Sequence, residues 1–314
     1  MKIIFFGSPE FAVPSLETIH QSNHQIAAVV TQPDRPSGRK LKLHAPAVKI
    51  AAEKFGLQII QPETTKDPNF VQQLADFHVD ILVVVAYGEI LRRNLLELAP
   101  HGAVNLHGSL LPKYRGAAPI AWAILNGEIE TGATTMKMNE KMDAGPVLLQ
   151  GKYPITPEHT TATLSSEIAT IGAQLLTQTL DLLEANTIQP KEQNVSQVSF
   201  APKLKKENGL IDWRKTADYI SRQIRAFDPW PGSFSTIQGK QVKIWRAYPE
   251  EKSTKEGPGT VLEIGKKDML IAAGEGSSLQ VLEVQPENRA RISAIDFANG
   301  QHLSAGSRFD VPLI

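Results

Sequence analysis

The sequence contains no cysteine among its 314 residues. This absence excludes disulfide bonds, thiolate nucleophiles and zinc sites with cysteine ligands, and it is typical of a reducing compartment. The chain also has no long hydrophobic run near its start. The apolar stretch at residues 2–6 stops at Gly7-Ser8-Pro9, so it is too short to cross a membrane and lacks a signal-peptide layout. We therefore expect a cytoplasmic protein without a membrane partner.

Several catalytic motifs are missing as well. Gly7 follows the first apolar run, where a dinucleotide-binding fingerprint would begin, but the second and third glycines of that fingerprint are absent. There is no P-loop, no G-x-S-x-G elbow and no H-E-x-x-H motif, and the eight histidines show no ligand spacing. These absences argue against a nicotinamide enzyme and against a bound metal.

The formal net charge is zero, but the charge is unevenly distributed. Residues 201–249 carry 10 Lys and Arg against 4 Asp and Glu, a local net charge of +6. Net charge bears on solubility and on charged partners rather than on the fold. This region is therefore either a solvated surface or a surface that binds a polyanion, and composition alone leaves both readings open.

The first 190 residues alternate between short apolar runs and amphipathic helical patterns. Strands are expected at 3–6, 26–30, 58–60, 81–86 and 103–106, and helices at 11–20, 47–55, 70–77, 92–98 and 118–125. Two further strands, at 133–138 and 147–154, and a long helix at 162–184 complete this region. The alternation predicts an α/β fold with a doubly wound, mostly parallel, Rossmann-like sheet that helices cover on both faces.

A different pattern follows the polar segment at 187–203. A helix is expected at 218–227, and short β-rich segments separated by glycine turns occur at 233–237, 242–247, 259–264, 269–272 and 279–284. Five short strands with one helix predict a small β-barrel of the OB kind. Because 314 residues exceed one ordinary core, we expect a catalytic domain at 1–189, a linker at 190–206 and a C-terminal β-barrel domain at 207–314.

Asn105 and His107 are the first candidates for chemistry. They stand two residues apart at the end of a predicted strand, so their side chains share one face. A carboxamide and an imidazole can both donate hydrogen bonds to an oxyanion on a carbonyl carbon. Asp143, in a small-residue turn with Gly145, could favour the protonated imidazole and accept a proton from an attacking amine. Such a site suits one-carbon acyl transfer, but a structural histidine and a plain Asp-x-Gly turn would give the same pattern.

The motif N-L-H-G-S-L-L-P at 105–112, followed by D-A-G at 143–145, resembles the signature of the 10-formyltetrahydrofolate-dependent formyltransferases. The resemblance implies the doubly wound fold, 10-formyltetrahydrofolate as the formyl donor, and no metal. It also implies that the catalytic residues are Asn105, His107 and Asp143. By the same resemblance, the folate contacts are Ser109, Leu110, Leu111 and Pro112.

Members of this family formylate a small ribonucleotide amine, a nucleotide sugar or initiator methionyl-tRNA, or they hydrolyse the folate. The segment at 31–43, T-Q-P-D-R-P-S-G-R-K-L-K-L, is similar to the acceptor-stem loop of the members that act on tRNA, and it departs from the usual pattern after Arg39. Basic side chains there can neutralise phosphates. The tRNA-binding residues that the resemblance implies are Arg35, Arg39, Lys40 and Lys42 in this loop, and Lys203 and Lys206 in the linker.

These features favour a monomeric enzyme that formylates the α-amino group of initiator methionyl-tRNA for translation initiation, with the barrel domain binding the tRNA. One alternative is a formyltransferase whose acceptor is an amino-sugar nucleotide. Another is a folate-storing or RNA-binding module with a vestigial site.

Overall fold

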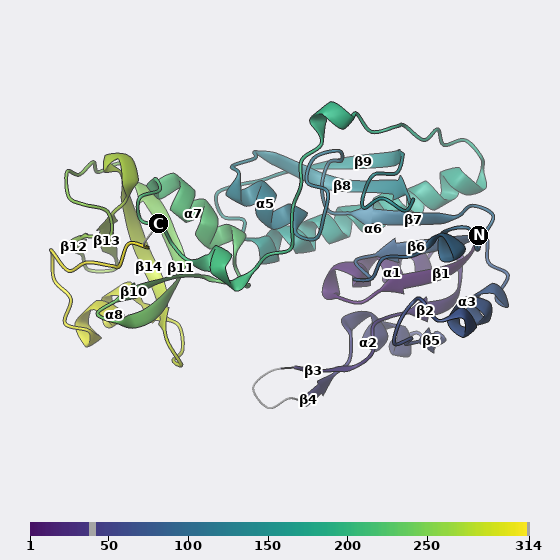
Figure 1. Cartoon of the computed structure of the whole chain (residues 1–314), viewed down its shortest axis with the longest axis horizontal. Helices are drawn as coiled ribbons and strands as arrows, with labels where there is room; N and C mark the ends of the chain where they lie inside the picture. Colours follow the sequence, from purple (N-terminus) through teal and green to yellow (C-terminus); the bar gives the residue numbers. More distant parts are fainter. Residues whose placement is uncertain (38–41, 313–314) are drawn as a thin grey trace. The chain divides into compact units, whose positions relative to one another are not determined.

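This computed structural model describes residues 1–37 and 42–312, and of Ser37 and Lys42 it describes only the backbone. The chain forms two compact units. The first comprises residues 1–119, 130–154 and 165–202, and the second comprises residues 120–129, 155–164 and 203–314. Each unit is described by itself below, with the element labels of Figure 1. The domain limits expected from the sequence stay a prediction.

The first unit is built on a seven-stranded sheet with the order β5-β2-β1-β6-β7-β8-β9 (Figure 1). Its strands are β1 (Lys2–Gly7), β2 (Gln25–Val30), β5 (Ile59–Ile60), β6 (Ile81–Val85), β7 (Ala103–His107), β8 (Glu130–Lys137) and β9 (Val147–Pro154). The first five strands pair in parallel, and β8 and β9 add on in antiparallel fashion. The doubly wound, mostly parallel sheet expected from the sequence is confirmed.

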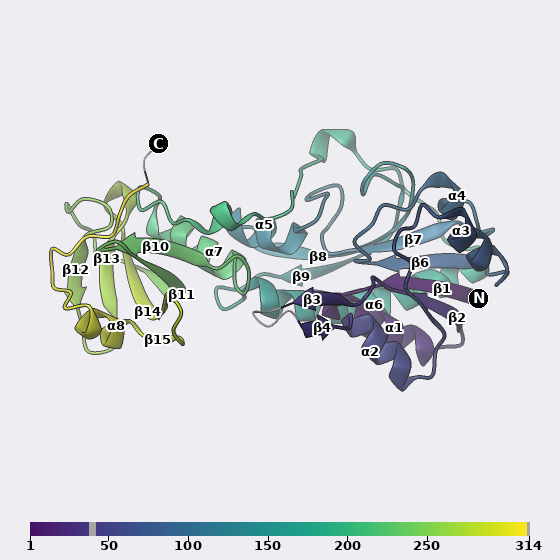
Figure 2. The same cartoon turned by 60° about the horizontal axis from the view of Figure 1, so that its bottom comes forward.

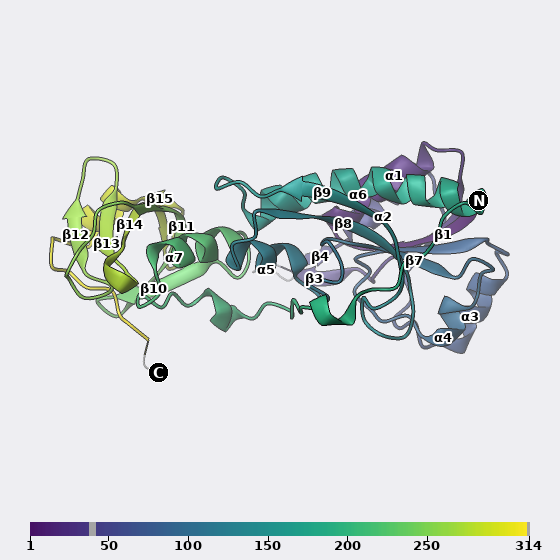
Figure 3. The same ribbon diagram turned by 90° about the horizontal axis from the view of Figure 1, so that it is seen from above.

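Helices cover both faces of this sheet (Figure 3). One face carries α1 (Val13–His20), α2 (Ala47–Lys54) and α6 (Thr161–Glu184, from residue 165 onward), and the other carries α3 (Pro68–Ala75) and α4 (Arg93–Leu96). Ile4 of β1 packs in one cluster with Phe70 of α3, whereas Ile3 points the opposite way and is also fully buried. Because both faces are covered, the central strands are apolar at nearly every position rather than at every second one.

The strand order reverses direction at β1. The chain adds β2 and β5 on one side of β1 and then crosses to place β6 on the other side. In open α/β sheets, ligands bind beyond the carboxyl ends of the strands near such a reversal. Ser8, which follows β1, donates from Oγ to the carbonyl oxygen of Tyr87, which follows β6, over 3.3 Å. His107 ends the next strand, β7, so the fold brings the predicted active-site segment to this edge.

The second unit contains an antiparallel sheet with the order β10-β11-β14-β13-β12, and β15 pairs with β14. Its elements are α5 (Pro119–Leu125, from residue 120 onward), α7 (Ala217–Ala226), β10 (Ser233–Ile237), β11 (Lys240–Glu250), β12 (Val261–Ile264), β13 (Met269–Ala272), β14 (Ser278–Pro286), β15 (Ile292–Ser293) and α8 (Ala294–Gly300). Phe309 bridges to Ile237 at one edge, and Arg308 bridges to Thr260 beside β12 at the other. These two residues close the sheet into the small barrel expected from the sequence.

Two features were not expected from the sequence. The first is the hairpin of β3 (Arg35–Ser37) and β4 (Lys42–His44), which lies at the start of α2 (Figure 2). Its strands hold three residues each, too few to show an apolar period. The second is α8, a two-turn helix that follows β15 directly. No helix within residues 1–37 and 42–312 has the length and apolar character needed to span a membrane.

Candidate active site

His107 is the last residue of β7, and its side chain is only 7% exposed. Its Nε2 atom lies 2.9 Å from the carbonyl oxygen of Tyr114. Because a carbonyl oxygen can only accept, Nε2 carries a proton and donates it to this bond. The other ring nitrogen, Nδ1, therefore faces the remaining partner, Oδ2 of Asp143, at 3.6 Å. This separation is that of an ion pair rather than a direct hydrogen bond.

Asp143 lies in the turn between β8 and β9 with φ of +50°. This left-handed conformation costs of order 1 kcal/mol for most L-residues and is tolerated best by Asn and Asp. The carboxylate is 15% exposed, and its Oδ2 accepts a hydrogen bond of 2.7 Å from the backbone N–H of Gly116. Gly116 has φ of +124°, and a Cβ there would lie 2.5 Å from the carbonyl oxygen of Ala201, so only glycine fits. The turn therefore aims Asp143 at His107.

Asn105 stands two residues before His107 on β7, so both side chains lie on the same face of the strand. The residue is partly exposed, and its side-chain amide makes no hydrogen bond to any other residue that the structure describes. Its donors are free for a bound molecule. The structure thus joins His107 to Asp143 and places Asn105 on the same side of the same strand end.

The turn predicted to contact folate, residues 109–112, is held by hydrogen bonds to β8. The hydroxyl of Ser109 donates to the carbonyl oxygen of Lys113 over 2.7 Å, and the residue is fully buried. The hydroxyl of Thr134 donates to the carbonyl oxygen of Ser109 over 2.6 Å and accepts from the backbone N–H of Leu111 over 3.1 Å. Leu111 is buried, while Leu110 and Pro112 keep partly exposed surface. That Ser109–Pro112 contact folate remains a prediction.

The predicted tRNA contacts divide into two groups. Arg35, Lys203 and Lys206 are exposed, and none of them pairs with an acid within the described part of the chain. Arg39 and Lys40 lie outside the described residues, and of Lys42 only the backbone is described. At the base of the β3–β4 hairpin, hydrogen bonds from Gln61 and Lys49 lower the pKa of Asp34.

Two residues near the site were missed by the sequence analysis. Gln193 donates from Nε2 to the carbonyl oxygens of Asp143 and Gly145, at 2.9 and 2.7 Å. Arg115 in turn donates to Oε1 of Gln193. Arg115 lies three residues after the motif at 105–112 and carries no predicted role. Gln193 lies 50 residues from Asp143 in a polar segment, so no local pattern could have found it.

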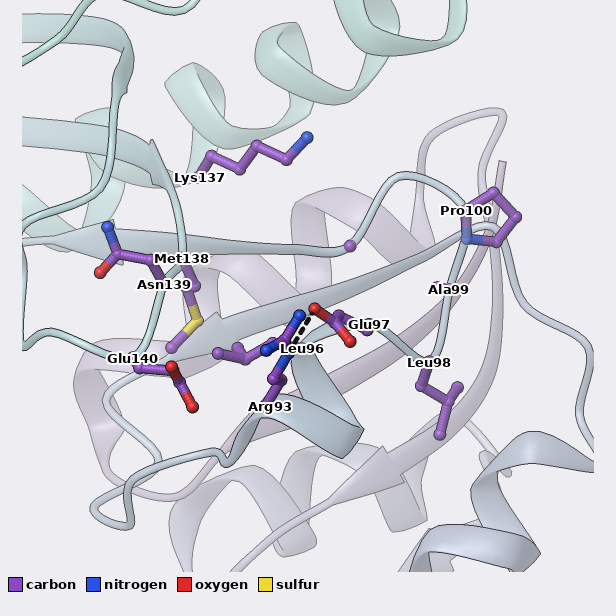
Figure 4. A pocket seen from close by; sticks show the side chains of 11 residues that line it. Arg93, Leu96, Glu97, Leu98, Ala99, Pro100, Lys137, Met138, Asn139 and Glu140 are labelled. Carbon is purple, nitrogen blue, oxygen red and sulfur yellow. Dashed lines mark hydrogen bonds and ion pairs between the residues drawn. The ribbon is translucent and has the colours of Figure 1, made fainter.

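A cavity of about 740 Å³ lies near the start of β7 and the end of β8 (Figure 4). Its charged lining includes Lys137, Glu140 and the ion pair between Arg93 and Glu97, whose Nε and Oε1 atoms are 2.8 Å apart. Asn105, His107 and Asp143 are not among its lining residues. Among residues 1–37 and 42–312, no three His, Asp or Glu side chains gather in a geometry that could hold a metal ion.

Comparison with known proteins identifies the family. Residues 1–180 match the formyl transferase family model, and residues 203–302 match the model of the formyl transferase C-terminal domain. The methionyl-tRNA formyltransferase of Solibacter usitatus is 45% identical over 98% of this chain and 98% of its own length.

Two solved structures share the fold. The sugar 3N-formyl transferase WlaRD, crystallised with dTDP and 5-N-formyl-THF, aligns with a TM-score of 0.68 and 21% identity over 92% of this chain and 99% of that protein. HypX from Aquifex aeolicus, in complex with tetrahydrofolic acid, aligns with a TM-score of 0.62 and 18% identity over 95% of this chain. The present chain spans about half of HypX, 47% of its length. With both domain models matched and near-full-length identity of 45%, this chain belongs to the formyl transferase family, and within it to the methionyl-tRNA formyltransferases.

Proposed function

We propose that this protein transfers the formyl group of 10-formyltetrahydrofolate to the α-amino group of methionyl-initiator-tRNA in the cytoplasm, giving the formylmethionyl-tRNA that starts translation. The family assignment over nearly the whole chain supports this proposal. The observation that supports the proposed chemistry is the ion pair of His107 with Asp143 on the same side of the strand end as Asn105, whose side-chain amide makes no hydrogen bond to another described residue. The sugar formyltransferase alternative has less support, because the sugar enzyme is only 21% identical and shares the fold alone.

The reaction needs an oxyanion to be stabilised and a proton to be moved. The methionyl amine attacks the formyl carbon, a C–N bond forms, and negative charge develops on the formyl oxygen. The amide of Asn105 and the protonated ring of His107 stabilise this charge. With Nε2 bound to Tyr114, Nδ1 is the ring nitrogen available to the reacting atoms.

Asp143 completes the proton balance. Its carboxylate faces Nδ1 of His107 and takes the proton that the attacking nitrogen loses. The tetrahedral intermediate then breaks its bond to N10 of the folate, and N10 receives the proton that Asp143 has taken up as tetrahydrofolate leaves. No protein side chain forms a covalent bond, so positioning and electrostatics carry the rate enhancement.

We further propose how the substrates are held. The turn at Ser109–Pro112 contacts the folate, and the phosphates of the tRNA are bound by Arg35, Arg39, Lys40, Lys42, Lys203 and Lys206. In this proposal residues 1–189 catalyse, residues 190–206 link, residues 207–314 bind tRNA, and the enzyme works as a monomer.

A transfer assay tests the proposed function. Folate carrying a labelled formyl group is offered with initiator methionyl-tRNA, elongator methionyl-tRNA or an amino-sugar nucleotide in parallel reactions. We expect label on the initiator tRNA at a rate well above that on either other acceptor. Label on the sugar nucleotide alone would support the alternative acceptor, and label on none of them would overturn the enzymatic proposal.

A further inference from the structure

Gln193 connects the turn of Asp143 to a segment that follows α6. Its Nε2 donates one hydrogen bond to the carbonyl oxygen of Asp143, at 2.9 Å, and another to that of Gly145, at 2.7 Å. A primary amide has two N–H donors, so both are used on the turn that carries the carboxylate. We infer that Gln193, oriented by Arg115, is a positioning residue that holds Asp143 toward His107. This inference rests on the proposed role of Asp143.

Arg115 fixes which way the amide of Gln193 points. The guanidinium donates from Nε and Nη2 to Oε1 of Gln193, at 3.1 and 2.8 Å. A charged two-donor fork holds the oxygen end of the amide in one orientation. Because the oxygen faces Arg115, the nitrogen must face the turn. The arginine therefore selects the rotamer of Gln193 that can donate to Asp143.

Three consecutive residues, 114–116, organise the whole arrangement. Tyr114 accepts from His107 through its carbonyl oxygen, Arg115 holds Gln193, and Gly116 donates its backbone N–H to the carboxylate of Asp143. Arg115 acts on the main chain of Asp143 through Gln193, whereas Gly116 contacts the side chain of Asp143 directly.

The segment after Gln193 fixes the loop at 114–116. The backbone N–H of Tyr114 donates to the hydroxyl of Ser199 over 2.9 Å, and the backbone N–H of Arg115 donates to the carbonyl oxygen of Ser199 over 2.9 Å. The backbone N–H of Ala201 donates to the carbonyl oxygen of Arg115 over 2.7 Å. Residues 193–201 thus support both the turn and the loop that faces it.

The turn of Asp143 needs such support for a physical reason. Its left-handed φ persists only where the surroundings impose it. Gly145 lies so close to the carbonyl oxygen of Lys137 that no Cβ fits there, so the turn has little room to relax on that side. Loss of the two hydrogen bonds from Gln193 would let the main chain rotate on the other side and move the carboxylate away from His107.

The test is a pair of substitutions, Gln193→Glu and Gln193→Ala. A glutamate keeps the shape and can still accept from Arg115, but it has no N–H to give the two carbonyl oxygens. We expect both variants to lose kcat by about 10- to 100-fold, the range that small misplacements of reacting groups produce. The KM values for folate and tRNA should stay within about twofold, because a residue that acts only by holding Asp143 changes the chemical step and not substrate binding.

The pH profile gives a readout that a merely structural role would not move. Gln193→Glu adds a titratable carboxyl group beside the turn of Asp143, whereas Gln193→Ala adds none. The acidic limb of the kcat profile should therefore differ from that of wild type in Gln193→Glu and not in Gln193→Ala. The matched control is Glu192→Gln, an exposed neighbour in the same segment, which should behave as wild type.

Three outcomes would overturn the inference: unchanged kcat in Gln193→Glu, a loss confined to KM, or a loss that only follows the folded fraction measured by circular dichroism. Failure of the proposed function is distinguishable, because it would appear as an inactive wild-type protein in the same assay. Active wild type with normal Gln193→Glu would remove only the positioning role.

Discussion

Asp143 combines a strained backbone with a buried, partnered carboxylate. Its left-handed φ carries a conformational cost, and its Oδ2 atom is held by Gly116 and faces His107. Strained non-glycine residues persist where the surrounding contacts determine them, and such positions gather at functional sites. The same residue therefore combines a stability cost with the chemical role proposed for it.

The substitution Asp143→Asn separates these two properties. Asparagine tolerates the left-handed region as well as aspartate does, so the melting temperature should change little. The amide cannot take a proton, so kcat should fall by roughly 10²- to 10⁴-fold. Formyl-transfer kinetics and thermal unfolding of the same preparation measure both effects.

The reverse exchange at another left-handed position is the control. Asn186 has φ of +55° and lies just past α6, so Asn186→Asp should leave kcat unchanged. Asp143→Asn with wild-type turnover would remove the carboxylate from the mechanism.

At this scale the sequence predicts the proposed reacting groups but not the contacts that support them. Asn105 and His107 are predicted from their spacing and by resemblance, and Asp143 from its turn motif. The use of Nε2 of His107 by Tyr114 and the reach of Gln193 across 50 residues depend on tertiary folding. Local patterns carry no information about such contacts.

Among the elements, α6 is tied to the turn before β2 through His24. The His24 side chain is fully buried, with Nε2 at 3.2 Å from Oδ1 of Asp181 and Nδ1 at 3.7 Å from Oε2 of Glu184. The backbone ammonium of Met1 also approaches Nδ1, at 3.1 Å. Burial, with help from this ammonium, lowers the pKa of His24 below its usual 6.5 in spite of the two carboxylates.

This lowered pKa predicts a pH-dependent stability. The unfolded chain binds a proton at His24 more readily than the folded protein does, so the free energy of unfolding rises with pH in this range. The contribution is complete above about pH 6.5 and is lost as the pH falls toward the folded-state pKa. Urea unfolding at pH 7, 6 and 5 should show this decline, and His24→Asn should flatten it. Parallel curves for the two proteins would contradict the assignment.

Predictability differs between the elements for a clear reason. The strands β1, β2 and β6 are short apolar runs because both faces are covered, and such runs are visible in sequence. The strands β3 and β4 have three residues each and no buried face to leave a pattern. The helix α4 is one turn at Arg93–Leu96 rather than the expected 92–98, since helix ends are the least predictable feature.

For the molecule as a whole, the charge of residues 201–249 predicts a salt-dependent interaction with tRNA. Each phosphate that a basic side chain neutralises releases counterions, so the logarithm of tRNA affinity should fall linearly with the logarithm of salt concentration. Lys203→Gln and Lys206→Gln should each reduce the magnitude of this slope by about 1. Filter binding from low to moderate salt measures it.

A control for this experiment comes from the same unit. Lys266 is an exposed lysine in the turn between β12 and β13, outside the basic region at 201–249. Lys266→Gln should leave the salt slope unchanged. A slope that does not respond to Lys203→Gln or Lys206→Gln would exclude these two side chains as phosphate contacts.

The chain length and the change in the pattern of apolar segments predict two folding regions. The sequence does not show which segments of the first 190 residues belong to the second region. Residues 120–129 and 155–164 belong to the second compact unit although they lie within the first 190 residues. The barrel closes through single bridges at Arg308 and Phe309, which are too brief to leave a strand pattern. Domain limits drawn as single positions along the sequence cannot describe a unit that is built from separate segments of the chain.

The hydrogen bonds of residues 193–201 bear on how this enzyme can be divided. Gln193 and Ser199 lie beyond residue 189, yet they hold Asp143 and the loop at 114–116. A fragment that ends at residue 189 would keep Asn105, His107 and Asp143 but would lose Gln193, which donates hydrogen bonds to the turn of Asp143. A shortened enzyme, chimera or domain swap built from this chain should therefore place its junction after Ala201.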